Sequence, residues 1–162
     1  MDKAILKALN DQVNREAESA YYYLSMAAYF DNTSYTGFAS WMKAQHAEEI
    51  EHMTKIYNFI YSRGGQVKFE TLKALNGNWK KPIDVFQEGL KHEQEITQAI
   101  NSLMGLAHSK KDYATISFLN WFVDEQVEEE ASFNDILSQF EMIGDNRAGL
   151  LMLDRQLGNR VK

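Results

Sequence analysis

A single proline, Pro82, occurs in the 162 residues of this chain, and long stretches on both sides of it repeat apolar residues every three or four positions. Such spacing places apolar side chains along one face of an α-helix. Proline is tolerated in the first turn of a helix, where its missing N–H would have no partner, so Pro82 predicts a helix start. The expected helices cover residues 3–30, 36–63, 82–108, 113–143 and 146–157.

Polar and glycine-containing segments separate these helices. Asp2 and Asp112 each precede a periodic segment and are suited to cap the helix that follows. The run from Asp31 to Ser34 is expected to end the first helix, and the glycine pair at 64–65 the second.

The four long segments would each extend roughly 40 to 48 Å at 1.5 Å per residue, so they must lie side by side to share one core. Short turns join the first helix to the second and the third to the fourth, which makes two antiparallel pairs. Residues 64–81 are numerous enough to cross the length of the bundle. The chain is therefore expected to be an all-α four-helix bundle with one long crossover loop and a short fifth helix, in a single domain over residues 1–162.

Acidic residues interrupt the apolar stripe of every long segment. A charge that faces a helical core costs several kcal/mol unless it is paired, hydrogen-bonded or bound to a cation. These acids lie near the middle of long helices, where neither caps nor helix dipoles explain them. They are Glu16 in the first segment, Glu49 with His52 in the second, Glu93 in the third, and Glu125 and Glu129 in the fourth. The pattern predicts a dinuclear metal site.

The chain has no cysteine, so a metal ion here must be held by carboxylate and imidazole. Hard Fe(III) prefers oxygen ligands and Fe(II) also accepts imidazole, which favours an iron pair that cycles between the two states. Two ions about 3.5 to 4 Å apart need a bridging oxygen. Glu49 is the expected bridge.

Composition excludes several other functions. The formal net charge of −6 and the lack of a clustered basic face argue against nucleic-acid binding. No apolar run approaches the ~18 residues of a membrane span, and the first residues lead directly into an amphipathic segment, so neither a membrane nor a secretory signal is expected. We expect a cytoplasmic protein.

Four motifs in register carry a family resemblance. They are N-x-E at Asn14–Glu16, E-E-x-x-H at Glu48–His52, K-H-E-Q at Lys91–Gln94 and W-F-V-x-E-Q-x-E-E-E at Trp121–Glu130. With them, essentially the whole chain resembles a bacterial non-haem ferritin of the ferritin-like superfamily.

The resemblance implies specific ligands. Glu16, Glu49 and His52 would hold one iron, and Glu49, Glu93 and Glu129 the second. A third iron site beside the pair would use Glu48, Glu125, Glu128 and Glu129. Tyr23 would hydrogen-bond a ligand or supply an electron, Gln126 would be an amide next to the site, and Trp121 would lie close enough to be oxidised. Bacterioferritins carry E-x-x-H in the fourth helix and bind haem through a Met directly after the bridging Glu. This chain has Glu128 in place of that His and Ile50 in place of that Met, so haem is not expected.

The implied function is that of a ferroxidase. Fe(II) would be oxidised by dioxygen or hydrogen peroxide and ferric mineral stored inside a shell of 24 identical subunits, with the fifth helix lining four-fold contacts. A di-iron or di-manganese enzyme acting on a small substrate, such as a catalase or oxygenase, and a purely structural bundle are the alternatives.

Several residues near the motifs have a simpler explanation. Glu48, Glu128 and Glu130 can belong to a solvated helix face, because consecutive residues point in different directions around a helix. His46 would lie at the core edge or near the metal ligands, His92 at the surface or an interface, and His108 near a helix C-terminus. Tyr21 and Tyr22 would face outward and contact another subunit.

Overall fold

The computed structural model describes residues 1–72 and 77–159. Residues 73–76, part of the expected crossover, and residues 160–162, the end of the expected domain, lie outside the described residues. Within the described residues the chain is helical and contains no strand. The helices are α1 (Lys3–Asn32), α2 (Thr36–Ser62), α3 (Pro82–Ser109), α4 (Tyr113–Ile143) and α5 (Arg147–Leu157).

Local chemistry explains where these helices begin and end. The side chains of Asp2 and Asp112 accept hydrogen bonds from the backbone N–H groups of Ala4 at 2.8 Å and Thr115 at 3.1 Å, which confirms both as N-caps. The expected run at 31–34 does end α1, because the C-cap is Thr33, but the helix continues through Asn32 and is two residues longer than expected.

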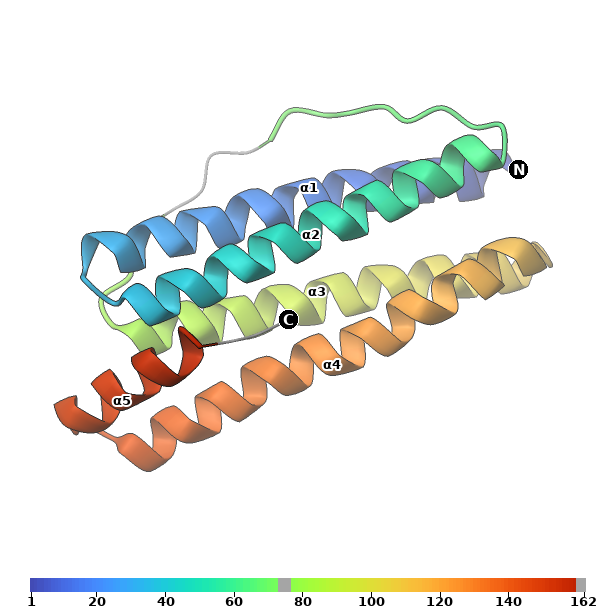
Figure 1. Ribbon diagram of the computed structural model, residues 1–162. Helices are drawn as coiled ribbons and strands as arrows, with labels where there is room; N and C mark the ends of the chain where they lie inside the picture. The colour runs from blue at the N-terminus through green and yellow to red at the C-terminus, as the bar shows by residue number, and fades with distance from the viewer. Residues whose placement is uncertain (73–76, 160–162) are drawn as a thin grey trace.

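The helices form two antiparallel pairs, α1 with α2 and α3 with α4, and residues 64–72 of the crossover run beside α1 (Figure 1). As a result, α2 and α3 run in the same direction. The expected all-α bundle with one crossover and a short fifth helix is confirmed. None of the helices in the described residues has the length and apolarity needed to span a bilayer.

Two asparagines on α1 hold the crossover against the bundle. Asn10 donates to the carbonyl of Gln66 at 3.0 Å and accepts from the N–H of Lys68 at 2.6 Å. One turn later, Asn14 donates to the carbonyl of Lys68 at 2.9 Å and accepts from the N–H of Glu70 at 2.8 Å. The Asn of the N-x-E motif therefore fastens the loop, while the Glu two residues later faces the interior.

Among the described residues, the buried apolar side chains form two clusters. The first cluster lies at the end of the bundle near α5 and includes Phe30, Phe38, Phe86 and Phe133. The other, around Leu9, Ile56 and Leu119 among others, fills the opposite end. In each long helix the inward acids fall between the residues of the first cluster and those of the second, so the predicted site occupies a polar layer between two apolar ends.

Candidate metal centre

All four long helices contribute to the buried polar layer. The four acids and the one imidazole at its centre are each at most 4% exposed. They are Glu16 from α1, Glu49 and His52 from α2, Glu93 from α3 and Glu129 from α4. Their positions follow from the helical spacing, since each lies on the same face as the apolar residues one and two turns away.

Glu16, Glu49 and His52 form the tightest group. One donor atom from each lies within 4.8 Å of the others, and His52 Nδ1 is 3.2 Å from Glu49 Oε2. The Oε2 atoms of Glu16 and Glu49 are buried and accept no hydrogen bond within the described residues. Buried oxygens without donors are rare in proteins and suit a cation between them. This group could hold a metal ion.

Glu93 is held from two sides. The Tyr23 hydroxyl donates to Glu93 Oε1, and the Gln126 amide donates to Glu93 Oε2 at 3.0 Å. Tyr23 is fully buried and stacks against Phe133, with 6.0 Å between ring centroids. Both residues expected beside the site therefore contact one of its carboxylates directly.

Two further buried amides hold site carboxylates. Gln45 Nε2 donates to Glu129 Oε2 at 2.7 Å, and Gln12 Nε2 donates to Glu16 Oε1 at 2.8 Å. Gln45 lies on the inward stripe of α2, but neither residue was expected as a site residue. The sequence did contain a signal for Gln12: it lies four residues before Glu16, one helical turn away on the same face, where its amide can reach that carboxylate.

The carboxylates are in an environment that opposes their charge. Burial, reinforced by the neighbouring carboxylates, raises the pKa of both Glu16 and Glu49 well above the usual value. Burial also raises the pKa values of Glu93 and Glu129 to about 7. Burial, with the charge of Glu93 next, raises the pKa of Tyr23, which keeps its hydroxyl a donor. Together these shifts mean that the full set of carboxylates ionises readily only when a cation balances it.

A second group extends the layer from His52. Donor atoms of His52, Glu125 and Glu129 lie within 4.8 Å of one another, and His52 Nε2 is 3.9 Å from Glu125 Oε1. Glu125 is partly exposed. The two nitrogens of the imidazole thus face different carboxylates, so His52 joins the two groups.

The other acids expected at a third site lie further out. Glu48 is half-buried, and its charge contributes to the raised pKa values of Glu49 and Glu129. Glu128 is exposed and belongs to neither group. Glu130 accepts a hydrogen bond from Thr97 at 2.6 Å, beside the layer rather than inside it.

Trp121 packs against the site from α4. Its ring centroid is 5.4 Å from that of His52, in an edge-on arrangement. Lys55 Nζ lies 3.9 Å from the centroid of the same ring. The indole is 37% exposed, so it lies between the imidazole and solvent.

One histidine and one tyrosine differ from their expected positions, and a second histidine agrees with its expected position. His92 is half-buried between α1 and α3, where its Nε2 is 2.7 Å from the Ser19 hydroxyl, and burial lowers its pKa to about 4. The expectation of a surface position is wrong, because the ring packs against Tyr22 with 5.0 Å between centroids. Tyr22 is likewise half-buried and donates to Glu88. His46 Nδ1 is 2.7 Å from the carbonyl of Ala20, a contact that fits a position at the core edge.

Comparison with known proteins identifies close relatives of the chain. A family model described as a ferritin-like domain matches residues 6–143. A bacterial non-heme ferritin of Staphylococcus aureus (strain MRSA252) is 44% identical over 161 residues, 99% of this chain and 97% of the relative. A second, from Staphylococcus haemolyticus, is 42% identical over 160 residues, 99% of this chain and 96% of the relative.

Solved structures agree with the sequence relatives. An open pore ferritin from the hyperthermophilic archaeon Archaeoglobus fulgidus superposes with a TM-score of 0.98 at 42% identity, and the match covers 99% of each chain. A form of that ferritin engineered to be closed gives a TM-score of 0.97 at 42% identity over 99% of this chain and 98% of the other.

Proposed function

The chain belongs to the ferritin family, which supports a role in iron storage, and from that premise we propose that it is a ferroxidase. In this proposal Fe(II) is oxidised at a dinuclear site within each subunit, and ferric mineral accumulates inside a cage of 24 subunits. The chain acts as one domain over residues 1–162. The substrates are Fe(II) and either dioxygen or hydrogen peroxide.

The observation that carries the proposal is a pair of buried oxygens that accept no hydrogen bond within the described residues: Oε2 of Glu16, and Oε2 of Glu49, which faces His52 Nδ1 at 3.2 Å. The hydrogen bonds that the neighbouring carboxylates do receive come from neutral amides and a tyrosine. A buried group of carboxylates without a balancing protein cation is costly, and divalent cations remove that cost. The donor set of carboxylates with one imidazole fits iron.

The proposed ligands are those that the family resemblance implies, and the contact between Glu16, Glu49 and His52 supports the first set. Glu16, Glu49 and His52 bind one Fe(II), and Glu49, Glu93 and Glu129 bind the other, with Glu49 shared between them. Tyr23 and Gln126 keep Glu93 aimed at the site through their hydrogen bonds. A third iron is proposed beside His52, Glu125 and Glu129, with Glu48 and Glu128 as further expected ligands.

The proposed reaction balances with two Fe(II) per turn. Each Fe(II) gives one electron, so a pair reduces dioxygen with two protons to hydrogen peroxide, or reduces hydrogen peroxide with two protons to two waters. Each iron becomes Fe(III). The hard Fe(III) product suits the oxygen ligands that dominate the site and, afterwards, an oxide mineral.

Native mass measurement and iron loading under air test this function together. We expect a particle with the mass of 24 subunits that turns amber as it takes up far more iron than its binding sites can hold. A small oligomer that binds two or three irons per chain and turns over a small substrate would instead establish a di-iron enzyme. A bundle with no response to iron would establish a structural role.

A further inference from the structure

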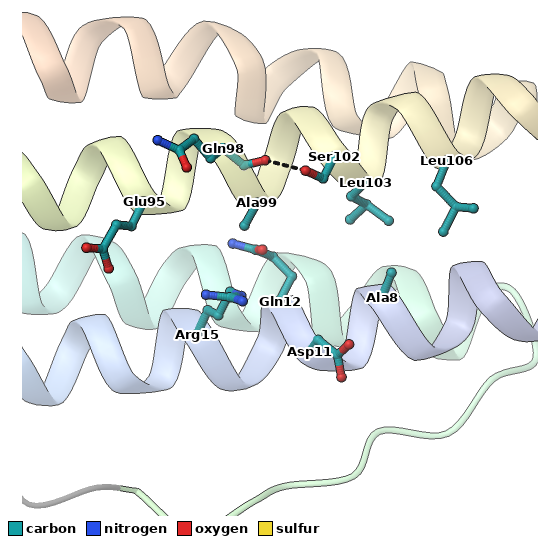
Figure 2. Close-up of a pocket in the computed structure, with 10 residues that line it drawn as sticks. All are labelled: Ala8, Asp11, Gln12, Arg15, Glu95, Gln98, Ala99, Ser102, Leu103 and Leu106. Carbon is teal, nitrogen blue, oxygen red and sulfur yellow. Dashed lines mark hydrogen bonds between the residues drawn. The ribbon is translucent and has the colours of Figure 1, made fainter.

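Gln12 lies both at the buried layer and in a pocket between α1 and α3. Its side chain is only 2% exposed and donates to Glu16 Oε1 at 2.8 Å. It also lines a pocket of about 530 Å³ between α1 and α3. Figure 2 shows its amide pointing into the space between these helices, close to Ala99 of α3.

The bond makes the two oxygens of Glu16 unequal. Oε1 accepts the Gln12 amide, whereas Oε2 is buried and accepts nothing within the described residues. Glu93 differs, because Tyr23 and Gln126 occupy one oxygen each. In Glu16 a single donor therefore determines both the rotation of the carboxylate and which oxygen stays available.

We propose that Gln12 is a positioning residue that holds Glu16 so that one oxygen, Oε2, faces the cation site beside Glu49 and His52. This inference rests on the proposed function, because it requires that a divalent cation binds there. It goes beyond that function because it assigns to Gln12 the orientation of Glu16, one of the proposed metal ligands.

A neutral amide suits this task better than other side chains. A lysine or arginine at position 12 would neutralise Glu16 and compete with the metal ion. An apolar residue would leave Oε1 without a donor, and the carboxylate could then rotate to bind with both oxygens. A hydrogen bond from the amide restrains rotation and leaves the negative charge in place.

The lining of the pocket is mixed in character. Its lining includes Asp11, Arg15 and Glu95, which carry charges of both signs, together with apolar residues. Gln98 lines the same pocket from α3 and is exposed. Gln98 thus offers a matched control. It is an amide of the same type in the same pocket, but the hydrogen bond that Glu16 accepts comes from Gln12.

The test is anaerobic Co(II) binding to the assembled protein, followed by the visible absorption of the ion, which reports its coordination. We expect Gln12→Met to weaken Co(II) binding by about 10- to 100-fold, the range typical for loss of a residue that orients a ligand, and to change the absorption bands. Gln98→Met should match the wild type in both. Circular dichroism of each variant verifies that it is folded, and Gln12→Leu provides a second, smaller replacement.

A double-mutant cycle separates positioning from simple packing. In a Glu16→Ala background, Gln12→Met should change neither the affinity nor the bands further, because Gln12 acts through Glu16. Wild-type and Gln12→Met proteins with identical Co(II) spectra and affinities would overturn the inference and leave the proposed function intact. A wild-type protein that binds no Co(II) would overturn both.

Discussion

Neutral donors surround the buried carboxylates of this protein. Gln12, Gln45 and Gln126 each donate to a different glutamate, and Tyr23 donates to Glu93. Neutral donors orient a carboxylate without cancelling its charge, whereas a lysine or arginine would do both. At the scale of single residues, these hydrogen bonds therefore orient the carboxylates without adding a positive charge to the layer.

Glu49→Gln is expected to lower the initial rate of Fe(II) oxidation by roughly 100-fold or more. Both proposed ions lose a ligand, which exceeds the 10- to 100-fold effect of losing a residue that only orients one. Stopped-flow absorbance under air measures the rate. Glu51→Gln is the matched control, because Glu51 is exposed on the same helix. An unchanged initial rate in Glu49→Gln would exclude the bridging role.

Glu125→Ala is expected to remove one Fe(II) per subunit from an anaerobic titration and to leave the fast oxidation phase intact. The reason is that Glu125 approaches His52 Nε2, on the side of the ring away from Glu49. Glu128→Ala, at an exposed position of the same helix, tests the fourth acid expected at this site. If the titration of Glu128→Ala still shows three ions, Glu128 is not a ligand.

At the scale of helices, α5 is held against the start of α2 by a close backbone approach. The buried Asp154 side chain accepts a hydrogen bond from the N–H of Phe38 at 2.8 Å. A Cβ at the adjacent Gly37 would overlap the carbonyl oxygen of Asp154. Glycine at position 37 thus allows the two helices to meet at the distance that this hydrogen bond requires.

Gly37→Ala is expected to destabilise the protein by about 2 kcal/mol, because a backbone overlap cannot be relieved by rotating a side chain. Denaturant unfolding measures the loss, and limited proteolysis should cut first in α5. Gly105→Ala is the control, since a Cβ there meets nothing within 4 Å; it should stabilise α3 by up to about 1 kcal/mol. Equal stability of Gly37→Ala and wild type would show that α5 shifts freely.

At the scale of the whole molecule, the polar layer lies between two apolar clusters, so its electrostatic cost acts on the stability of the entire bundle. Apolar packing at both ends keeps water out of the layer and keeps the carboxylates together. Their raised pKa values are the consequence.

The stability of the metal-free protein is expected to fall as pH rises from about 5 to 8. The pKa of Glu93 and of Glu129 is about 7 in the folded state, against 4.5 for an ordinary glutamate. The folded state therefore binds more protons between these values, so the loss begins near the lower pKa and is complete above the higher one. For Glu129 alone the loss is roughly 3 kcal/mol.

Denaturant midpoints measured with a chelator at several pH values test this profile. Added Zn²⁺ should reverse the trend, because fewer protons compete with the ion at higher pH. Glu129→Gln should reduce the slope of the metal-free profile. A flat profile without metal would show that these carboxylates ionise as freely as in the unfolded chain.

The sequence alone predicted the helices to within about two residues, two of their N-caps and the acids that are buried. Pro82, Asp2 and Asp112 act on their own few residues, and the spacing of Glu16 from its apolar neighbours needs only the pitch of a helix. The four motifs that carry the family resemblance could also be recognised from the sequence, because each lies within a single helix.

Only the tertiary structure decided which atoms meet. Helical spacing sets the face of a side chain but not the rotation of one helix against another, so it could not choose Glu125 over Glu128 beside His52. Nor could it show that Gln12 takes one oxygen of Glu16 and leaves the other unpartnered. Those outcomes depend on distances near 3 Å between side chains of packed helices, which arise only when the two apolar clusters bring the helices together.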